Sequence, residues 1–138
     1  MTVHQADVLV PGGPARGPAL VLQAPISFWG GVDPGSGQII DVRHPDRGRS
    51  VTGRVLFLPG TIGSSSASAV LMELVRAELA PAALVLHQPD AILLLGLVVA
   101  REMGWPAPPA LRLDRSLFAD FASAPVHVGE DGRIGAPA

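Results

Sequence analysis

Apolar residues form two kinds of run along this chain, and their spacing predicts strands and helices in alternation. Residues 54–58 and 82–86 are short, almost continuous apolar runs, the pattern of strands buried on both faces. Between them, apolar positions recur at helical spacing from Ala69 to Leu79, which predicts a helix that Pro81 ends. A strand, a helix and a strand in this order predict a parallel strand pair joined by a crossover.

A second helix is predicted from Ala91 to about Met103. Asp90 suits the N-cap position, and Gly104 suits the turn that follows a helix. The helix is apolar on nearly every side until Arg101. We therefore expect it to be buried all round.

Shorter apolar runs predict further strands near both ends of the chain. Residues 8–10 and 19–22 are expected to be antiparallel strands, and residues 38–41 to form a short strand that closes a hairpin. The C-terminal part is expected to contain a strand at 110–113, a short helix at 115–121 and a hairpin over 126–134. This order predicts one mixed α/β domain over residues 1–138. It is not a dinucleotide-binding fold, because the first strand-to-helix turn lacks Gly-x-Gly-x-x-Gly.

Charge and composition narrow the classes of function. Ten basic and twelve acidic residues give a net charge of −2, without the basic surface of a nucleic-acid-binding protein. Charged residues make up only 16% of the chain, below the usual quarter or so, so part of the surface is expected to face a partner. The N-terminus has no signal-peptide pattern, and the longest apolar stretch, residues 91–100, is far short of the ~20 residues that span a bilayer. We expect a cytoplasmic protein without membrane contact.

The chain is not expected to bind a metal or cofactor by itself. It has no cysteine, and its four histidines are dispersed without the spacing of metal ligands. Any iron–sulfur cluster would therefore take its ligands from another chain.

The strongest candidate for chemistry is the small-residue turn at residues 59–66. It joins a buried strand to the start of a helix, where free backbone N–H groups and the helix dipole favour an anion such as a substrate carboxylate. Gly63 lets the backbone come close to a ligand. One of Ser64, Ser65 and Ser66 could act there as a base. Alternatively, the serine only caps the helix, and the spacing alone favours that simpler role.

A second candidate is the apolar loop that contains Ser27, Phe28, Trp29, Gly30 and Gly31. Two aromatic side chains beside two glycines suit a partner-binding knob or the lip of a substrate pocket. A loop packed on its own core would have the same composition. Both interpretations are open at this stage.

Two rival classes of function also remain. A small hydrolase could use Ser64 with His87 and Asp90, although the Gly-x-Ser-x-Gly pattern is absent. A protein-binding module could use the aromatic loop as its docking surface.

Taken together, these segments resemble the small, swivel-domain component of aconitase X enzymes. The resemblance lies in residues 24–34, with the run Ser-Phe-Trp-Gly-Gly-Val-Asp-Pro, and in residues 37–45, 53–66 and 82–96. It covers nearly the whole chain. It implies a swivelling β/β/α domain and a separate large subunit, or a fused region, that carries an iron–sulfur cluster.

The resemblance also implies roles for individual residues. The first serine after the glycine, Ser64, corresponds to the proton acceptor of aconitase-like enzymes. The site-lining residues would be Gly63, Ser65, Ser66, Ser27, Phe28, Trp29, Gly30 and Gly31. Aconitase has an arginine soon after its serines, whereas this chain continues Ser66-Ala67-Ser68. The substrate therefore differs from a tricarboxylate or is held by the large subunit.

The implied activity is that of a hydro-lyase subunit, inactive without its large subunit, that acts on a small hydroxy acid. Bacterial members of the family resemble cis-3-hydroxy-L-proline dehydratases, which form Δ1-pyrroline-2-carboxylate. Archaeal members resemble phosphomevalonate dehydratases of an isoprenoid route. A chain rich in alanine, glycine and arginine and without lysine is typical of a GC-rich bacterial genome, which favours hydroxyproline as the substrate.

Overall fold

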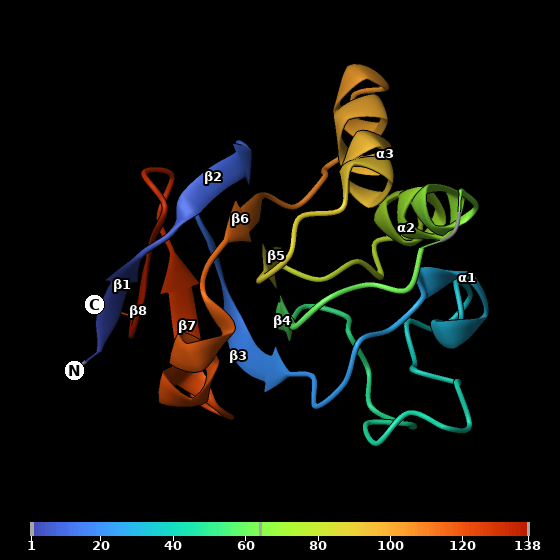
Figure 1. Ribbon diagram of the computed structural model, residues 1–138. Helices are drawn as coiled ribbons and strands as arrows, with labels where there is room; N and C mark the ends of the chain where they lie inside the picture. Colours follow the sequence, from blue (N-terminus) through green and yellow to red (C-terminus); the bar gives the residue numbers. More distant parts are fainter. Residues whose placement is uncertain (1, 64, 138) are drawn as a thin grey trace.

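The computed structural model describes residues 2–63 and 65–137 as a curled mixed sheet with helices packed against both of its faces (Figure 1). The strands are β1 (Val3–Gln5), β2 (Asp7–Val10), β3 (Ala15–Val21), β4 (Val55–Leu58), β5 (Ala83–Leu86), β6 (Ala110–Arg112), β7 (Pro125–Val128) and β8 (Arg133–Gly135). The helices are α1 (Phe28–Gly31), α2 (Ala67–Arg76), α3 (Ala91–Glu102) and the 3₁₀ helix η1 (Arg115–Phe121). The strand order is β1-β8-β7-β3-β4-β5-β6-β2.

The strand order requires the sheet to curl. Only Ala6 separates β1 from β2 in the chain, yet these strands occupy the two ends of the order. The two edges must therefore approach each other. In the middle, β3 joins the two halves: residues 15–18 are antiparallel to β7, and residues 19–21 are parallel to β4.

Two cores lie on the two faces of the central strands. In β4, Val55 and Phe57 point into the curled sheet, where they pack with the η1 residues Phe118 and Phe121. The intervening Leu56 and its β5 neighbours of the same parity point toward the helices. Because side chains alternate along a strand, a strand between two cores has to be apolar at every position. This explains the continuous runs in the sequence.

The central predictions are confirmed. β4 and β5 are parallel neighbours, with Leu56 opposite Leu84, and α2 lies between them in the chain. Asp90 is the N-cap of α3, and its carboxylate accepts from the N–H groups of Ile92 and Leu93. Residues 126–134 form the predicted hairpin of β7 and β8.

Two strand predictions need correction, and one strand was missed. The predicted strand at 8–10 lies in β2 and is antiparallel, but its partner is β6. The predicted strand at 19–22 was expected to be antiparallel, yet residues 19–21 lie in the part of β3 that is parallel to β4, and only residues 15–18 of β3 are antiparallel, to β7. Residues 38–41 form only isolated bridges, Val32 with Ile39 and Gln38 with Ser50, because the chain turns away after one pair. The short helix predicted at 115–121 is present as the 3₁₀ helix η1, whereas β1 was not anticipated.

The expectation that α3 is buried all round is wrong. One side of the helix, which includes Leu93, Gly96, Leu97 and Ala100, is buried. The opposite side exposes Ile92, Leu95, Val98 and Val99, with Met103 just beyond the helix end. Within residues 2–63 and 65–137, no helix is both long enough and apolar enough to cross a membrane.

Candidate functional site

The candidate site lies at one edge of the sheet because four neighbouring strands run in the same direction. β3, β4, β5 and β6 are parallel to one another. The segments that follow β3, β4 and β5 therefore emerge at the same edge, the place where open α/β sheets bind ligands. These are residues 22–27, residues 59–66, which we call the serine loop, and residues 87–90.

The serine loop is held on both sides by hydrogen bonds. On one side the Ile62 N–H donates to the Ile26 carbonyl at 3.0 Å, next to a bridge between Ile26 and Thr61. On the other side the Thr61 hydroxyl donates to Asp90 Oδ2 at 2.7 Å. The other oxygen of Asp90 caps α3. One carboxylate thus fixes the start of α3 and the serine loop relative to each other.

The predicted serine base itself, Ser64, lies outside the described residues. Its neighbours Gly63 and Ser65 are exposed, and Ser66 is the N-cap residue of α2. The first turn of α2 contains no acidic residue, so its positive dipole end is not neutralised locally. A hollow of about 380 Å³ opens beside the loop, lined by Thr61, Gly63, Gln88, Pro89, Asp90, Ala91 and Ile92.

The aromatic loop folds into the short turn α1, and its two rings differ in environment. Phe28 is only 1% exposed and belongs to the core. This residue therefore fits the alternative in which the loop packs on its own core. Trp29 is 60% exposed. Gly30 has a φ of +77°, a conformation in which glycine is favoured. Gly31 is buried against Ile26.

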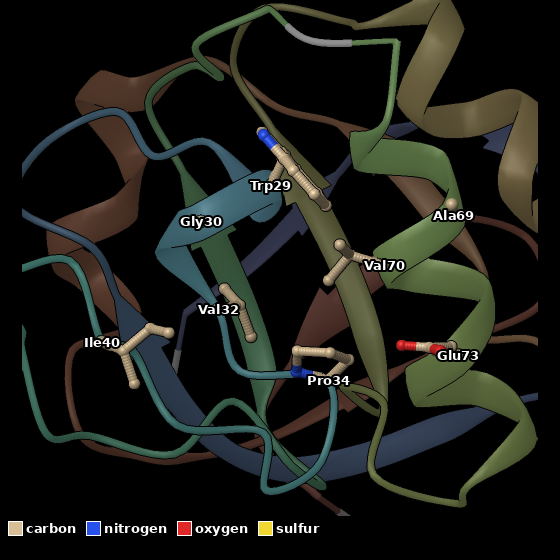
Figure 2. Close-up of a pocket in the computed structure, with 8 residues that line it drawn as sticks. All are labelled: Trp29, Gly30, Val32, Pro34, Ile40, Ala69, Val70 and Glu73. Carbon is tan, nitrogen blue, oxygen red and sulfur yellow. The ribbon is translucent and has the colours of Figure 1, made fainter.

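The exposed indole borders a second hollow, of about 430 Å³, between α1 and α2 (Figure 2). Its walls are mostly apolar, and Glu73 supplies the carboxylate among them. The lining residues are Trp29, Gly30, Val32, Pro34, Ile40, Ala69, Val70 and Glu73. Because α2 starts directly after the serine loop, the two candidate segments of the sequence are neighbours in space.

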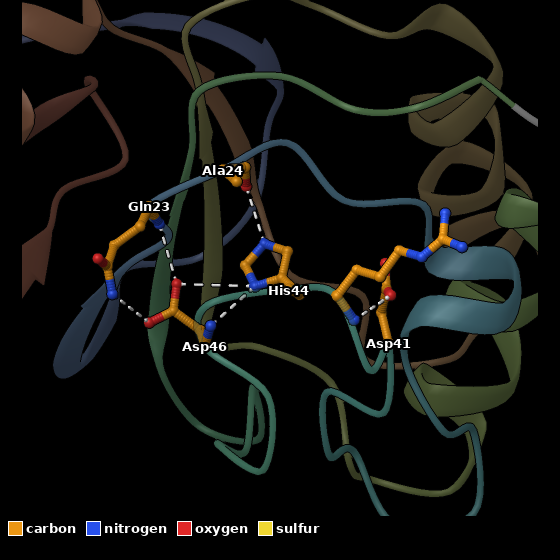
Figure 3. A network of polar contacts seen from close by, with 6 residues as sticks. Gln23, Ala24, Asp41, His44 and Asp46 are labelled. Atoms are coloured by element: carbon orange, nitrogen blue, oxygen red, sulfur yellow. Dashed lines mark hydrogen bonds and ion pairs between the residues drawn. The ribbon is translucent and has the colours of Figure 1, made fainter.

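Sequence reasoning missed a buried polar network behind these loops (Figure 3). His44 Nε2 lies 2.9 Å from the Ala24 carbonyl, and the Asp46 N–H donates to His44 Nδ1 at 3.0 Å. Because the carbonyl can only accept, the ring proton sits on Nε2 and Nδ1 is unprotonated. The carboxylate of Asp46 in turn accepts from the backbone and side-chain nitrogens of Gln23.

This network fixes residues 23–24, two positions before the Ile26 carbonyl that holds the serine loop. Both side chains, His44 and Asp46, are 2% exposed. From the sequence, His44 was considered as a metal ligand and as part of the family resemblance, but not as part of a buried network. The His-x-Asp spacing that pairs a ring nitrogen with a nearby backbone N–H is the signal that could have revealed it.

The remaining ionisable groups give little support to rival chemistry. His87 Nδ1 accepts the Arg115 N–H at 3.0 Å, although in a serine-hydrolase triad this nitrogen would face the carboxylate. Hydrogen bonds from the Ser36 hydroxyl and then the Gly35 N–H lower the pKa of Asp33, which is therefore an ordinary turn carboxylate. In the two described ranges, no group of three or more His, Cys, Asp or Glu residues could hold a metal ion.

Comparison with known proteins identifies the fold family. Residues 3–134 match the aconitase X swivel domain family. The chain belongs to this family. The swivel domain also superimposes on the crystal structure of Thermococcus kodakaraensis aconitase X (holo-form) with a TM-score of 0.86 and 26% identity, over the full length of both chains. The resemblance inferred from the sequence and the swivel fold are both confirmed.

Two curated relatives of the swivel domain carry different names. One is the cis-3-hydroxy-L-proline dehydratase of Pseudomonas aeruginosa, 43% identical over 137 residues, which are 96% of this chain and 23% of that protein. The other is the phosphomevalonate dehydratase small subunit of Methanothermobacter thermautotrophicus, 46% identical over 88 residues, which are 64% of this chain and 67% of that protein. The swivel domain thus spans about a quarter of the Pseudomonas relative.

The residues of the swivel domain do not fit an iron–sulfur cluster. The chain has no cysteine, and the described residues offer no cluster of alternative ligands. The structure does bring together the serine loop, the aromatic loop and Asp90. The roles assigned to Ser64 and to the site-lining residues stay predictions.

Proposed function

We propose that this chain is the swivel component of a hydro-lyase that removes water from a small hydroxy acid, with cis-3-hydroxy-L-proline as the substrate and Δ1-pyrroline-2-carboxylate as the product. The supporting observation is the 43% identity to cis-3-hydroxy-L-proline dehydratase across 96% of the chain. That relative is about four times longer than the matched segment, so a large chain or region would complete the enzyme.

The chemistry divides between the two parts. Dehydration removes a proton from the carbon that bears the carboxylate and a hydroxyl group from the neighbouring carbon. An iron–sulfur cluster, which the family resemblance implies for the large subunit, would supply Lewis acidity. This chain contributes none of its ligands.

The part assigned to this chain is proton removal by Ser64. Gly63 and Ser65, the described neighbours, are exposed beside a hollow of about 380 Å³. The first backbone N–H groups of α2, which have no partner within the helix itself, lie near this loop. These groups favour the substrate carboxylate and any negative charge that develops on a serine oxygen. The Thr61–Asp90 and Ile62–Ile26 hydrogen bonds hold the loop in place for this task.

A second substrate has its own support. The phosphomevalonate dehydratase small subunit is similar to this chain in length as well as in sequence, since the match covers 67% of that protein. Phosphomevalonate carries a phosphate that the hydroxyproline lacks. Measuring the turnover of each substrate by the assembled enzyme, and comparing the two rates, would decide between them.

The decisive experiment replaces Ser64 with alanine in the complex with the large chain. If Ser64 is the base, turnover falls by roughly 10²–10⁴, the usual effect of a positioned acid–base group, while the complex still assembles. If Ser64 has only a structural role before Ser66, the N-cap residue of α2, the chain loses at most ~1 kcal/mol of stability and turnover is largely retained. Ser65→Ala and Ser66→Ala are the matched controls. A dead Ser65→Ala beside an active Ser64→Ala would move the role by one residue, and three active variants would place the base on the other chain.

A further inference from the structure

The exposed side of α3 and the residue just beyond its end carry five of the eleven exposed large apolar side chains among the described residues. Large side chains there are Ile92, Leu95, Val98, Val99 and Met103, of which Leu95 and Met103 are 57% and 59% exposed. No charged residue interrupts the helix before Arg101. Apolar side chains scattered singly over a surface are ordinary, but five along one helix mark a contact surface. We call these five residues the α3 face.

We infer that the α3 face is the surface on which the large chain of the proposed dehydratase docks; this inference rests on the function proposed above. From Ile92 to Met103 the face extends for about 16 Å at 1.5 Å per residue. In Figure 1 α3 projects beyond the sheet, so this side is accessible to a partner. The other side of α3 is already occupied by α2.

The position of Ile92 connects the α3 face to the candidate site. Ile92 lines the hollow beside the serine loop together with Thr61 and Gly63. A partner that covers the α3 face therefore also forms a wall of that hollow. This is the arrangement required if the partner supplies the cluster and this chain supplies the serine. Docking would bring both to the same cavity and exclude water from it.

The large chain is a better occupant than a second copy of this chain. In the Pseudomonas relative, more than three quarters of the polypeptide lies outside the matched segment, so a large body is available to cover the surface. Two copies paired through α3 would bring two serine loops together, and neither copy has cysteine. The site would remain incomplete.

The test is a charge placed at the centre of the α3 face. Leu95→Lys should weaken association with the large chain by at least tenfold, because a lysine in an apolar contact loses its hydration without gaining a partner. Val3→Lys is the matched control. Val3 is 54% exposed and lies on β1, on the far side of the molecule from α3, so this variant should bind normally. Binding is measured by sedimentation of the coexpressed pair, and thermal melting of each variant checks its fold.

The outcomes of this test distinguish a wrong docking surface from a wrong proposed function. If Leu95→Lys binds the large chain as tightly as Val3→Lys does, the docking surface is wrong, whatever the activity. If Leu95→Lys abolishes assembly but the complex of the unsubstituted chains dehydrates neither substrate, the docking surface is supported and the proposed function is wrong. If the isolated chain dimerises and Leu95→Lys makes it monomeric without affecting the large chain, the occupant is a second copy and the inference is overturned.

Discussion

Replacing Gly96 with alanine tests how closely α2 and α3 must pack beside the serine loop. A methyl group at this position would lie 2.9 Å from the Ser68 backbone oxygen, 3.1 Å from its Cβ and 3.2 Å from its Cα. Two of these atoms are backbone and the third is the first side-chain atom, so no change of rotamer relieves the contact. The two helices would have to move apart by a few tenths of an ångström.

Two opposing effects determine how much Gly96→Ala changes the free energy of unfolding. Alanine is favoured over glycine inside a helix by about 1 kcal/mol. Overpacking a well-packed contact costs about 1–3 kcal/mol, and a contact with backbone atoms falls in the middle of that range or above. The expected net result is a loss of about 1 kcal/mol in the free energy of unfolding. For a domain of this size this corresponds to a fall of about 4 °C in Tm.

Urea denaturation and thermal melting of the purified chain measure this loss. The matched control is Ala69→Gly at an exposed position of α2, which changes helix propensity without a close contact and should cost about 1 kcal/mol. In the complex, Gly96→Ala should also lower turnover, because Ser68 lies only two residues after the serine loop. A variant more stable than the natural chain would refute the reasoning, since propensity would then outweigh the contact with Ser68.

Two further pairs of substitutions test the site. Phe28→Ala should lower the free energy of unfolding, measured by urea denaturation, by about 3–5 kcal/mol because the ring is buried in the core. Trp29→Ala should leave stability nearly unchanged and weaken assembly or turnover. Equal losses of stability in the two variants would contradict this difference. Asp90→Ala should destabilise the chain more than Thr61→Val, because Asp90 caps α3 as well as holding the serine loop and a lost cap costs ~1 kcal/mol. Equal melting temperatures for these two variants would show that the cap contributes little.

The parts of the fold that the sequence predicted are those specified by neighbouring residues. The buried strands β4 and β5 are apolar at every position because both faces are covered, and the Asp90 cap depends on residues two and three positions away. The serine loop was also identified locally, as a glycine- and serine-containing turn between a strand and a helix.

The parts that were missed depend on distant residues. β1 is three residues long and pairs with residues 133–135, and nothing near Val3 specifies that partner. The antiparallel partners of β2 and β3 lie in the C-terminal half for the same reason. α3 was expected to be buried because it is apolar on both sides, but the sequence alone does not show which side this chain covers. His44 binds the Ala24 carbonyl 20 residues away, a contact that the spacing of the histidines does not reveal.

The pairing of β1 with β8 has a consequence for how the proposed enzyme would be held together. It places the first and last strands side by side, with Val3 opposite Gly135, away from α3 (Figure 1). A polypeptide joined at either end would start far from the α3 face, so the connection would act as a tether and not as part of the contact. A tether raises the effective concentration of its two parts, often to the millimolar range, so a fused enzyme needs only weak docking and can release and re-form the contact during turnover. If the two parts are separate chains, the proposed docking on the α3 face would have to provide the association free energy without that help.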